Sequence, residues 1–249
     1  MFNLRGKTIL VTGGSRGIGA AIVRALAAGG AEVVLHYGRS QAEAERVARE
    51  AGNCYVVRAD LAQPGVAREL WEKALTFRGK IDVLVNNAGI APYARVEDGF
   101  GQWSQVWNET LQVNLLALAD LCREAILHYR TRGGGILINI ASRAAFRGDD
   151  PDLMHYAASK GAVVALTKSI ARGFGKEGIL AYGVAPGWVE TEMAADYIRE
   201  HAADIARDIP IGSVAPPQDV ANTVAFLAAG LAPHMTGATL DINGASYVR

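Results

Sequence analysis

The sequence predicts an α/β protein in which a doubly wound parallel sheet of about seven strands carries helices on both faces. Short β-branched runs alternate with longer segments of helical periodicity along the 249 residues. The runs are continuously apolar, which is typical of strands that are buried on both faces. Strict alternation of strand and helix favours parallel strands joined by right-handed connections. No linker, low-complexity tract or internal repeat interrupts the pattern, so we predict a single domain over residues 1–249.

The first half of the chain supplies four predicted strands and three predicted helices. The strands are Thr8–Val11, Glu32–Tyr37, Cys54–Ala59 and Ile81–Val85, and the helices are Ile18–Ala28, Gln41–Glu50 and Val66–Phe77. Glycines mark several boundaries, because the first helix stops at Gly29 and the second before Gly52. Glycine readily ends a helix and allows a tight turn.

The second half begins with a long helical segment that three glycines, residues 133–135, bring to an end. The predicted helices are Trp103–Tyr129, His155–Phe174, Thr191–Arg207 and Pro217–Ala229, and the strands are Ile136–Ala141, Ile179–Ala185 and Thr239–Ile242. In an open sheet of this kind, ligands bind beyond the carboxyl ends of the strands. The functional residues are therefore expected at those ends.

The composition argues against several classes of protein, including nucleic-acid-binding, disulfide-rich, metal-binding and membrane-spanning proteins. The formal net charge is zero, so there is no bulk attraction to nucleic acid or to an acidic membrane. Cys54 and Cys122 lie far apart in apolar segments, which favours buried thiols over a disulfide framework. The histidines lack metal-binding spacing, and we predict no metal. No signal-peptide layout and no apolar run of about 18 residues are present, so we expect a cytoplasmic protein.

A glycine-rich loop joins the first strand to the first helix. It reads Thr-Gly-Gly-Ser-Arg-Gly-Ile-Gly over residues 12–19. Glycines allow the backbone to approach a diphosphate closely, and the amino end of a helix offers free N–H groups and partial positive charge. We therefore predict a dinucleotide diphosphate site at Gly13, Ser15, Arg16, Gly17, Ile18 and Gly19.

The same loop also satisfies Gly-x-Ser-x-Gly, the nucleophile elbow of α/β-hydrolases, with Ser15 as the serine. That elbow follows several strands, whereas only one strand precedes Ser15 in this sequence. Position in the chain therefore favours the dinucleotide site over the hydrolase.

The end of the second strand indicates which dinucleotide binds. An acid about 20 residues beyond the loop would bind the ribose 2′-hydroxyl of NAD and repel the 2′-phosphate of NADP. This chain has Tyr37, Arg39 and Ser40 there, and no acid. Arginines suit a phosphate, and both Arg16 and Arg39 lie within reach. We predict that NADP(H) is favoured, with NAD(H) as the alternative.

Five motifs, in this order, resemble those of the short-chain dehydrogenase/reductases. They are the glycine loop, Asn86-Asn87-Ala88-Gly89, Ser142 after a strand, Tyr156-Ala157-Ala158-Ser159-Lys160, and Pro186-Gly187 with Thr191. The resemblance covers essentially the whole chain and is strongest to the 3-oxoacyl-[acyl-carrier-protein] reductase type. It implies a Rossmann-type sheet in the order 3-2-1-4-5-6-7 and an NAD(P)-dependent oxidoreductase.

Tyr156 and Lys160 are the predicted centre of the chemistry. Residues four apart share one face of a helix. A free phenol has a pKa of about 10, which is too high for ready proton exchange near neutrality. A neighbouring ammonium and a cationic nicotinamide would both stabilise the phenolate. Tyr156 would then give a proton to the oxygen of the substrate as hydride arrives at its carbon.

The resemblance assigns the remaining site residues. It implies that Ser142 hydrogen-bonds the substrate oxygen and that Asn114 holds a water linking Lys160 to solvent, so the predicted catalytic residues are Asn114, Ser142, Tyr156 and Lys160. Asn86 is expected to be structural. Further cofactor contacts are implied at Asp60, Leu61, Asn87, Ala88, Gly89, Pro186, Gly187, Val189 and Thr191, together with Tyr156 and Lys160.

Substrate contacts are less constrained by the sequence. Residues 190–213 are expected to form a substrate lid, as in the family. Other residues placed to line the pocket are Tyr93, Arg95, Arg143, Phe146, Arg147, Asp152 and Trp188. Trp103 and Trp107, four apart on a helix, fit core packing or a subunit interface. The resemblance implies a homotetramer.

Three functions remain open. The first is reduction of a 3-oxoacyl thioester, for which relatives dock an acidic carrier on basic residues; Arg130, Arg132 and Lys176 fit that role, but Glu177 weakens the match. The second is oxidation or reduction of a polyol, sugar or cyclic alcohol. The third is a non-catalytic dinucleotide sensor, against which the retained catalytic residues argue.

Overall fold

A computed structural model of the chain describes residues 2–192 and 195–249. Within them, seven parallel strands form one sheet in the order β3-β2-β1-β4-β5-β6-β7, as predicted. The strands are β1 (Thr8–Val11), β2 (Glu32–Tyr37), β3 (Cys54–Arg58), β4 (Val83–Asn86), β5 (Gly135–Ile140), β6 (Ile179–Pro186) and β7 (Thr239–Ile242). The order reverses between β1 and β4, and a crevice for ligands is expected at such a point.

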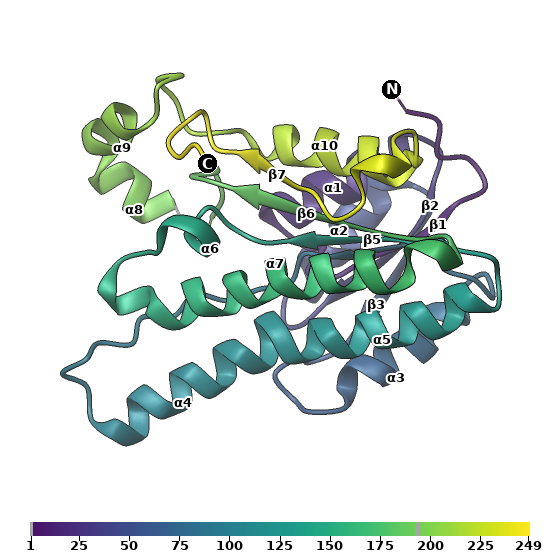
Figure 1. Cartoon of the computed structure of the whole chain (residues 1–249), viewed down its shortest axis with the longest axis horizontal. Helices are drawn as coiled ribbons and strands as arrows, with labels where there is room; N and C mark the ends of the chain where they lie inside the picture. Colours follow the sequence, from purple (N-terminus) through teal and green to yellow (C-terminus); the bar gives the residue numbers. More distant parts are fainter. Residues whose placement is uncertain (1, 193–194) are drawn as a thin grey trace.

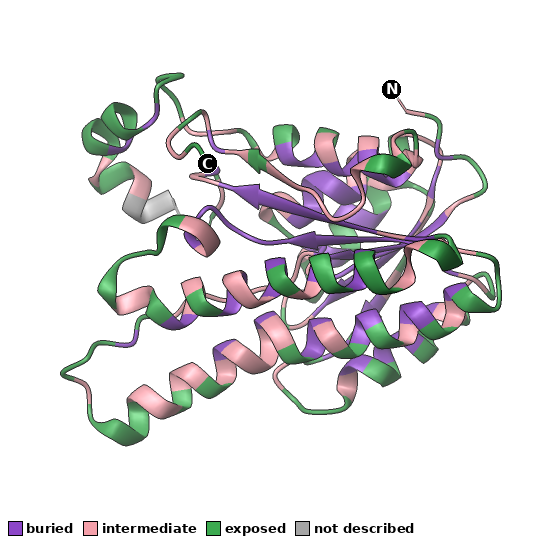
Figure 2. Cartoon of the chain, viewed as in Figure 1, coloured by how far each residue is buried: buried purple, intermediate pink, exposed green. Residues whose placement is uncertain are grey.

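Helices cover both faces of the sheet (Figure 1). One layer contains α1 (Gly17–Ala28), α2 (Gln41–Ala51) and α10 (Pro217–Ala229), and the other contains α3 (Val66–Leu75), α4 (Phe100–Leu111), α5 (Ala117–Arg130) and α7 (Met154–Phe174). The five inner strands are almost wholly buried between the two layers, as the purple ribbons of Figure 2 show, whereas the edge strands β3 and β7 are partly exposed.

Side chains that alternate along each strand fill two hydrophobic cores, one on each face of the sheet. Ile9 and Val11 of β1 pack toward α1 and α10, whereas Leu10 packs toward α3 and α5. Successive strand residues point to opposite faces, so a strand covered on both sides must be apolar throughout. This explains the continuous apolar runs in the sequence.

The structure differs from the predicted elements in two helical segments. The segment predicted at Trp103–Tyr129 spans α4 and α5, with a π-helical turn, Gln112–Leu116, between them. The helix predicted at Thr191–Arg207 is two short helices, α8 (Ala195–Glu200) and α9 (Ala202–Asp208). Residues 193 and 194 of that prediction lie outside the described residues. A short helix, α6 (Ala144–Arg147), was not predicted.

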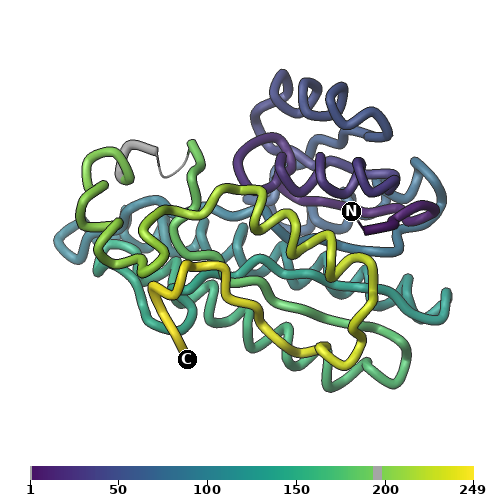
Figure 3. The backbone as a smooth tube through the Cα atoms, turned by 90° about the horizontal axis from the view of Figure 1, so that it is seen from above, coloured from purple at the N-terminus to yellow at the C-terminus, as the bar shows by residue number. Residues whose placement is uncertain are grey.

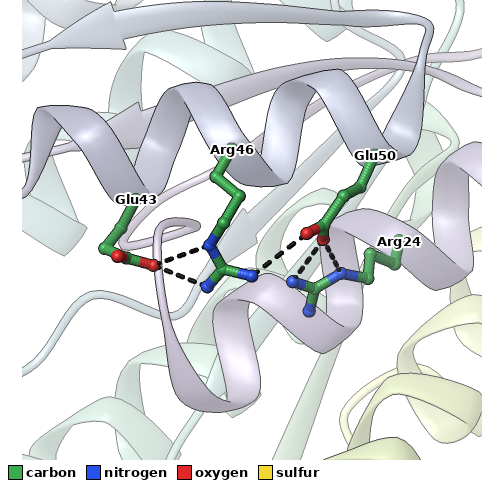
Figure 4. A network of polar contacts seen from close by, with 4 residues as sticks. All are labelled: Arg24, Glu43, Arg46 and Glu50. Carbon is green, nitrogen blue, oxygen red and sulfur yellow. Dashed lines mark hydrogen bonds and ion pairs between the residues drawn. The ribbon is translucent and has the colours of Figure 1, made fainter.

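A surface network joins α1 to α2 (Figure 4). Glu50 accepts hydrogen bonds from Arg24 of α1, at 2.8 Å, and from Arg46 of its own helix, at 3.0 Å. Arg46 also pairs with Glu43. These groups are exposed, and such pairs contribute about 0–1 kcal/mol each. The network aligns α2 rather than holding the fold together.

The carboxyl ends of the strands meet α6, α8, α9 and the C-terminal residues at one end of the molecule (Figures 1 and 3). The C-terminal segment folds back there, since Ser246 N–H donates to the carbonyl oxygen of Asn243. Among the described residues, no helix is both long and apolar enough to cross a membrane.

Candidate active site

A cavity of about 1040 Å³ opens along the carboxyl edge of the sheet. Its wall runs from the ends of β3 and β2, past the glycine loop after β1, to the loops after β4, β5 and β6 and the start of α7. The volume is at the upper end of the range of small-molecule sites. The cavity therefore has room for a dinucleotide and a small substrate.

The residues predicted to contact the cofactor gather on this wall, with one exception. Those on the wall are Gly13, Ser15, Arg16, Gly17, Ile18, Gly19, Arg39, Ser40, Asp60, Leu61, Asn87, Ala88, Gly89, Tyr156, Lys160, Pro186, Gly187, Val189 and Thr191. Tyr37 departs from the prediction, because it is buried in the core beside Leu35. Side-chain alternation along β2 decides this, and His36 lines the cavity instead.

The amino end of α1 is open toward the cavity. Arg16 occupies the position before the helix, no side chain caps the end, and the first turn contains no acid. Unpaired N–H groups at such an end carry partial positive charge. Arg16 and Arg39 are exposed on the wall, and within the described residues neither has a carboxylate partner. The donors in this part of the cavity could therefore hold an anionic group such as a diphosphate.

His36 holds the glycine loop against the sheet, a role that the sequence analysis missed. The N–H of Gly13 donates to His36 Nδ1 at 3.1 Å, and His36 Nε2 lies 3.0 Å from the carbonyl oxygen of Ala59. Nδ1 must therefore be the unprotonated nitrogen, and Nε2–H the donor. Burial lowers the pKa of His36 to about 4, against smaller raising effects of Ala59 and Asp60.

The depressed pKa of His36 predicts a pH dependence of stability. The folded pKa of about 4 lies below the ordinary value of 6.5, so the stabilising contribution is complete above pH 6.5 and is lost as the pH falls toward 4. Between pH 7 and pH 5 the loss is about 2 kcal/mol. We expect His36→Leu to be less stable at pH 7 but to lose less on acidification, as measured by urea unfolding at both pH values. The exposed His234→Leu is the control; an unchanged pH dependence in His36→Leu would contradict the prediction.

Ser142, Tyr156 and Lys160 converge at the other end of the cavity. Ser142 follows β5, and the other two lie one turn apart at the start of α7. Lys160 Nζ is 5.7 Å from the centroid of the Tyr156 ring and donates to the carbonyl oxygen of Ile140 at 2.9 Å. Tyr156 is partly exposed to the cavity, whereas Lys160 is 4% exposed. The predicted catalytic side chains thus share one wall.

Asn114 lies directly behind this wall and is fully buried. It occupies the centre of the π-helical turn. Its Oδ1 accepts from the N–H of Ile90 at 2.8 Å, and its Nδ2 donates to the carbonyl oxygen of Ile90 at 2.9 Å and to Ser159 Oγ at 3.1 Å. A Cβ on Gly89 would come within 3.4 Å of both Asn114 Oδ1 and Lys160 Nζ. Asn114 therefore ties the loop after β4 to α7.

Burial, rather than the lysine, controls the pKa of Tyr156 in the protein alone. Desolvation raises the pKa of the phenol, Asp149 raises it further, and the hydrogen bond of Ser142 lowers it. Burial lowers the pKa of Lys160 to about 8. A positive charge at the ring end of the cavity would oppose the effect of burial.

The asparagines after β4 have different roles. Asn86 is buried, and its Nδ2 donates to Asn139 Oδ1 at 2.9 Å. Asn87 donates to the carbonyl oxygens of Thr12 and Gly13. The structural role predicted for Asn86 agrees with this placement, and Asn87 connects the glycine loop to the cavity wall.

The substrate end is polar and partly aromatic. Of the residues placed there from the sequence, Tyr93, Arg143, Arg147, Asp152 and Trp188 line the cavity, whereas Arg95 and Phe146 do not. The cavity is also lined by four residues that no sequence motif indicated, Asp149, Asp150, Ser246 and Tyr247. No group of three or more histidine, cysteine, aspartate or glutamate residues among those described is arranged to hold a metal ion.

The chain was compared with known proteins. A family model described as enoyl-(acyl carrier protein) reductase matches residues 13–245. The 3-oxoacyl-[acyl-carrier-protein] reductase FabG of Chlamydia pneumoniae is 35% identical over 244 residues, which are 97% of each protein. The FabG of Escherichia coli K12 is 34% identical over 250 residues, 99% of each.

Two solved structures are similar to this chain in both sequence and fold. A short-chain dehydrogenase/reductase from Serratia marcescens has a TM-score of 0.90 and 35% identity, and the match covers 98% of this chain and 99% of that one. A putative NAD(P)-dependent gluconate 5-dehydrogenase from Beutenbergia cavernae, with bound NADP at low occupancy, has a TM-score of 0.88 and 37% identity, covering 98% and 97%.

The fold and the site together define an NAD(P)-dependent oxidoreductase. The open amino end of α1 and the converging Ser142, Tyr156 and Lys160 line one cavity. The chain belongs to the short-chain dehydrogenase/reductase family.

Proposed function

We propose that the protein is an NADP(H)-preferring oxidoreductase that transfers hydride between the nicotinamide and a carbonyl or secondary-alcohol carbon. The observation that carries this proposal is the convergence of Ser142, Tyr156 and Lys160 on a cavity that the open amino end of α1 also lines. The bound cofactor would supply or accept the hydride. The chain's own residues would orient the substrate and move the proton.

Each catalytic side chain has a proposed role. Tyr156 is the acid/base, since its phenol lines the cavity. Ser142 hydrogen-bonds the substrate oxygen and positions it for that proton. Lys160 stabilises the phenolate and reaches the nicotinamide ribose. Asn114, fixed in the π-helical turn, aligns the backbone of that turn for a proton path to solvent.

The proposed cofactor pose follows from the wall residues. Gly13, Gly17 and Gly19 admit the diphosphate to the amino end of α1, and Asp60 with Asn87 lies on the adenosine side. Val189 and Thr191 meet the nicotinamide carboxamide. The described residues thus offer a partner for each end of the dinucleotide.

The two exposed arginines favour NADP(H). Arg39→Ala is expected to weaken NADPH binding about 10- to 100-fold, because a charge-assisted hydrogen bond is worth about 1.5–3 kcal/mol. NADH lacks the 2′-phosphate, so its affinity is expected to change less than about twofold. Fluorescence titration of both cofactors measures this, with the exposed Arg49→Ala as control. Equal losses for the two cofactors would refute the assignment.

For the substrate, we propose first a 3-oxoacyl thioester. Relatives named 3-oxoacyl-[acyl-carrier-protein] reductase FabG support it. One feature opposes carrier docking: Arg130 is engaged by Glu177 in a two-bond pair, at 2.6 and 3.1 Å. One of the three basic side chains predicted to meet the carrier is thus already paired with a carboxylate.

A polyol, sugar or cyclic alcohol is the second candidate. The specific observation that favours it is the set of carboxylates on the substrate end of the cavity, Asp149, Asp150 and Asp152. Carboxylates accept hydrogen bonds from hydroxyl groups, whereas an acyl chain needs an apolar channel. The similarity to a putative gluconate 5-dehydrogenase is consistent with this candidate.

One assay separates the candidates. The purified protein is given acetoacetyl thioester with NADPH or NADH, and a panel of polyols, sugars and cyclic alcohols with the oxidised cofactors. Thioester reduction supports the first candidate, and its absence together with turnover of a hydroxylated compound supports the second. Cofactor binding without any turnover would indicate a dinucleotide sensor.

The protein's assembly and location are also proposals. We propose a homotetramer, with the exposed Phe100 and the neighbouring Trp103 in a subunit contact. Residues 190–213 are proposed as the substrate lid. Two free cysteines, Cys54 and Cys122, suit the reducing cytoplasm.

A further inference from the structure

Arg143, the residue that directly follows Ser142, is buried although it carries a charge. Its side chain is only 6% exposed. A guanidinium remains protonated in proteins, and a buried charge is costly unless it has partners. Burial and the nearby Arg147 both lower the pKa of Arg143, while Asp208 opposes them. The partners of Arg143 therefore indicate what the side chain does.

Those partners come from three segments that are far apart in the sequence. Arg143 Nη1 donates to Asp208 Oδ2 of α9 at 3.0 Å and to Ser246 Oγ of the C-terminal segment. Its guanidinium carbon lies 5.5 Å from the ring centroid of Trp188, in the loop after β6. Its own N–H donates to the carbonyl oxygen of Pro186 at 2.9 Å. One side chain thus links α9, the C-terminal segment and the loop after β6.

The linked segments surround the substrate end of the cavity. Trp188, Ser246 and Tyr247 line it together with Arg143 itself. Figures 1 and 3 show α9 and the C-terminus at the same end of the molecule as α6. Asp208 is 44% exposed, and Arg147 Nη1 lies 3.9 Å from the same oxygen. Solvent can therefore reach the carboxylate of Asp208, so the ion pair between Arg143 and Asp208 can break.

We propose that Arg143 is a positioning residue that holds α9 and the C-terminal segment against Ser142 and so shapes the substrate end of the cavity. The proposal rests on the proposed function in one respect, namely that the substrate binds beside Ser142. Arg143 acts through Asp208, Ser246 and Trp188 and needs no contact with the cofactor. Substrate affinity, rather than hydride transfer or cofactor affinity, is the property that it controls.

Kinetics of Arg143→Met and Asp208→Asn test the link. Each variant is expected to raise the KM for the carbonyl substrate about tenfold, the effect of losing one charge-assisted hydrogen bond. We expect kcat and the Kd of NADPH to stay within about threefold of the unsubstituted protein. The double variant should be no worse than Arg143→Met, because that substitution already removes the interaction with Asp208. Arg143→Lys should recover part of the affinity for the substrate, since lysine keeps the positive charge but lacks the several N–H donors of a guanidinium.

A second measurement does not depend on activity. Arg207 precedes Asp208 and its side chain is 79% exposed, so trypsin cleavage after Arg207 reports how firmly α9 is held. Cleavage is expected to be several-fold faster in Arg143→Met and to increase less in Arg143→Lys. Asp208→Asn is tested by KM alone, because residue 208 directly follows the bond that trypsin cuts. Arg24→Met, which removes an ion pair on the α1–α2 surface (Figure 4), is the matched control and should leave cleavage unchanged.

The outcomes are distinguishable. If Asp208→Asn lowers KM, Arg143 binds an anionic group of the substrate, and the positioning role is wrong. If KM is unchanged in Asp208→Asn and cleavage is unchanged in Arg143→Met, the link is dispensable and the proposal is also wrong. If Arg143→Met does not fold, KM of Asp208→Asn and cleavage of Arg143→Lys decide. If the unsubstituted protein turns over no substrate, the proposed function fails, while the cleavage comparison still tests the link.

Discussion

Tyr156→Phe is expected to lower kcat about 10²- to 10⁴-fold, the usual contribution of one general acid or base. The substitution keeps the ring that Lys160 Nζ approaches at 5.7 Å and removes only the hydroxyl on the cavity wall. The affinity for NADPH should stay nearly intact, because the diphosphate is proposed to bind at the other end of the cavity. Steady-state kinetics and a fluorescence titration of NADPH measure the two quantities separately.

Tyr182→Phe is the matched control. Tyr182 is buried in β6, and its hydroxyl donates to the carbonyl oxygen of Ala232 at 3.2 Å, away from the cavity. Its loss is expected to cost about 1 kcal/mol of stability and to leave kcat unchanged. If Tyr156→Phe retained more than about a tenth of kcat, the loss would be smaller than the usual contribution of a general acid or base. Another group would then have to move the proton.

Gly19→Ala is expected to have the second large effect. A Cβ at this position would lie 2.0 Å from the carbonyl oxygen of Gly13 and 2.6 Å from Asn87 Nδ2. Alanine in a helix is favoured over glycine by about 1 kcal/mol, but a backbone oxygen at that distance must move. We expect the glycine loop to be displaced, with NADPH and NADH binding both weakened at least tenfold, in line with overpacking costs of about 1–3 kcal/mol.

Gly173→Ala separates the clash from helix propensity. Gly173 lies in the last turn of α7, is exposed, and has no atom within 4 Å of an added Cβ. This control should raise the melting temperature slightly and leave cofactor affinity unchanged. Gly19→Ala should lower both the melting temperature and the cofactor affinity. Differential scanning fluorimetry measures the first and fluorescence titration the second. Wild-type affinity in Gly19→Ala would mean that the loop tolerates the added methyl group.

Residues that act through a single local pattern were predictable. The glycine loop, Ser142 at a strand end, and the Tyr156–Lys160 pair each depend on spacing along one strand or helix. The cavity brings them together because the carboxyl ends of parallel strands meet at one edge. Local periodicity and the order of elements were sufficient for that part of the arrangement.

Residues defined by long-range contacts were not predictable in the same way. No local pattern indicated a role for His36, although it hydrogen-bonds to Gly13 and Ala59, each 23 residues away. Tyr37 was placed in the cofactor site because the pattern gives a strand end but not which side chain turns toward the cavity. The π-helical turn at Asn114 leaves no periodic signal that separates it from the helices around it.

The sequence by itself determined the alternation of strands and helices, the apolar faces that form both cores, and the motifs at the strand ends, because each depends on neighbours a few residues apart. Only the tertiary structure decided the dominance of burial over Lys160 in setting the pKa of Tyr156, and the meeting of Arg143 with Asp208 and Ser246. Desolvation and contacts between distant segments depend on how the whole chain packs, and no local spacing encodes them.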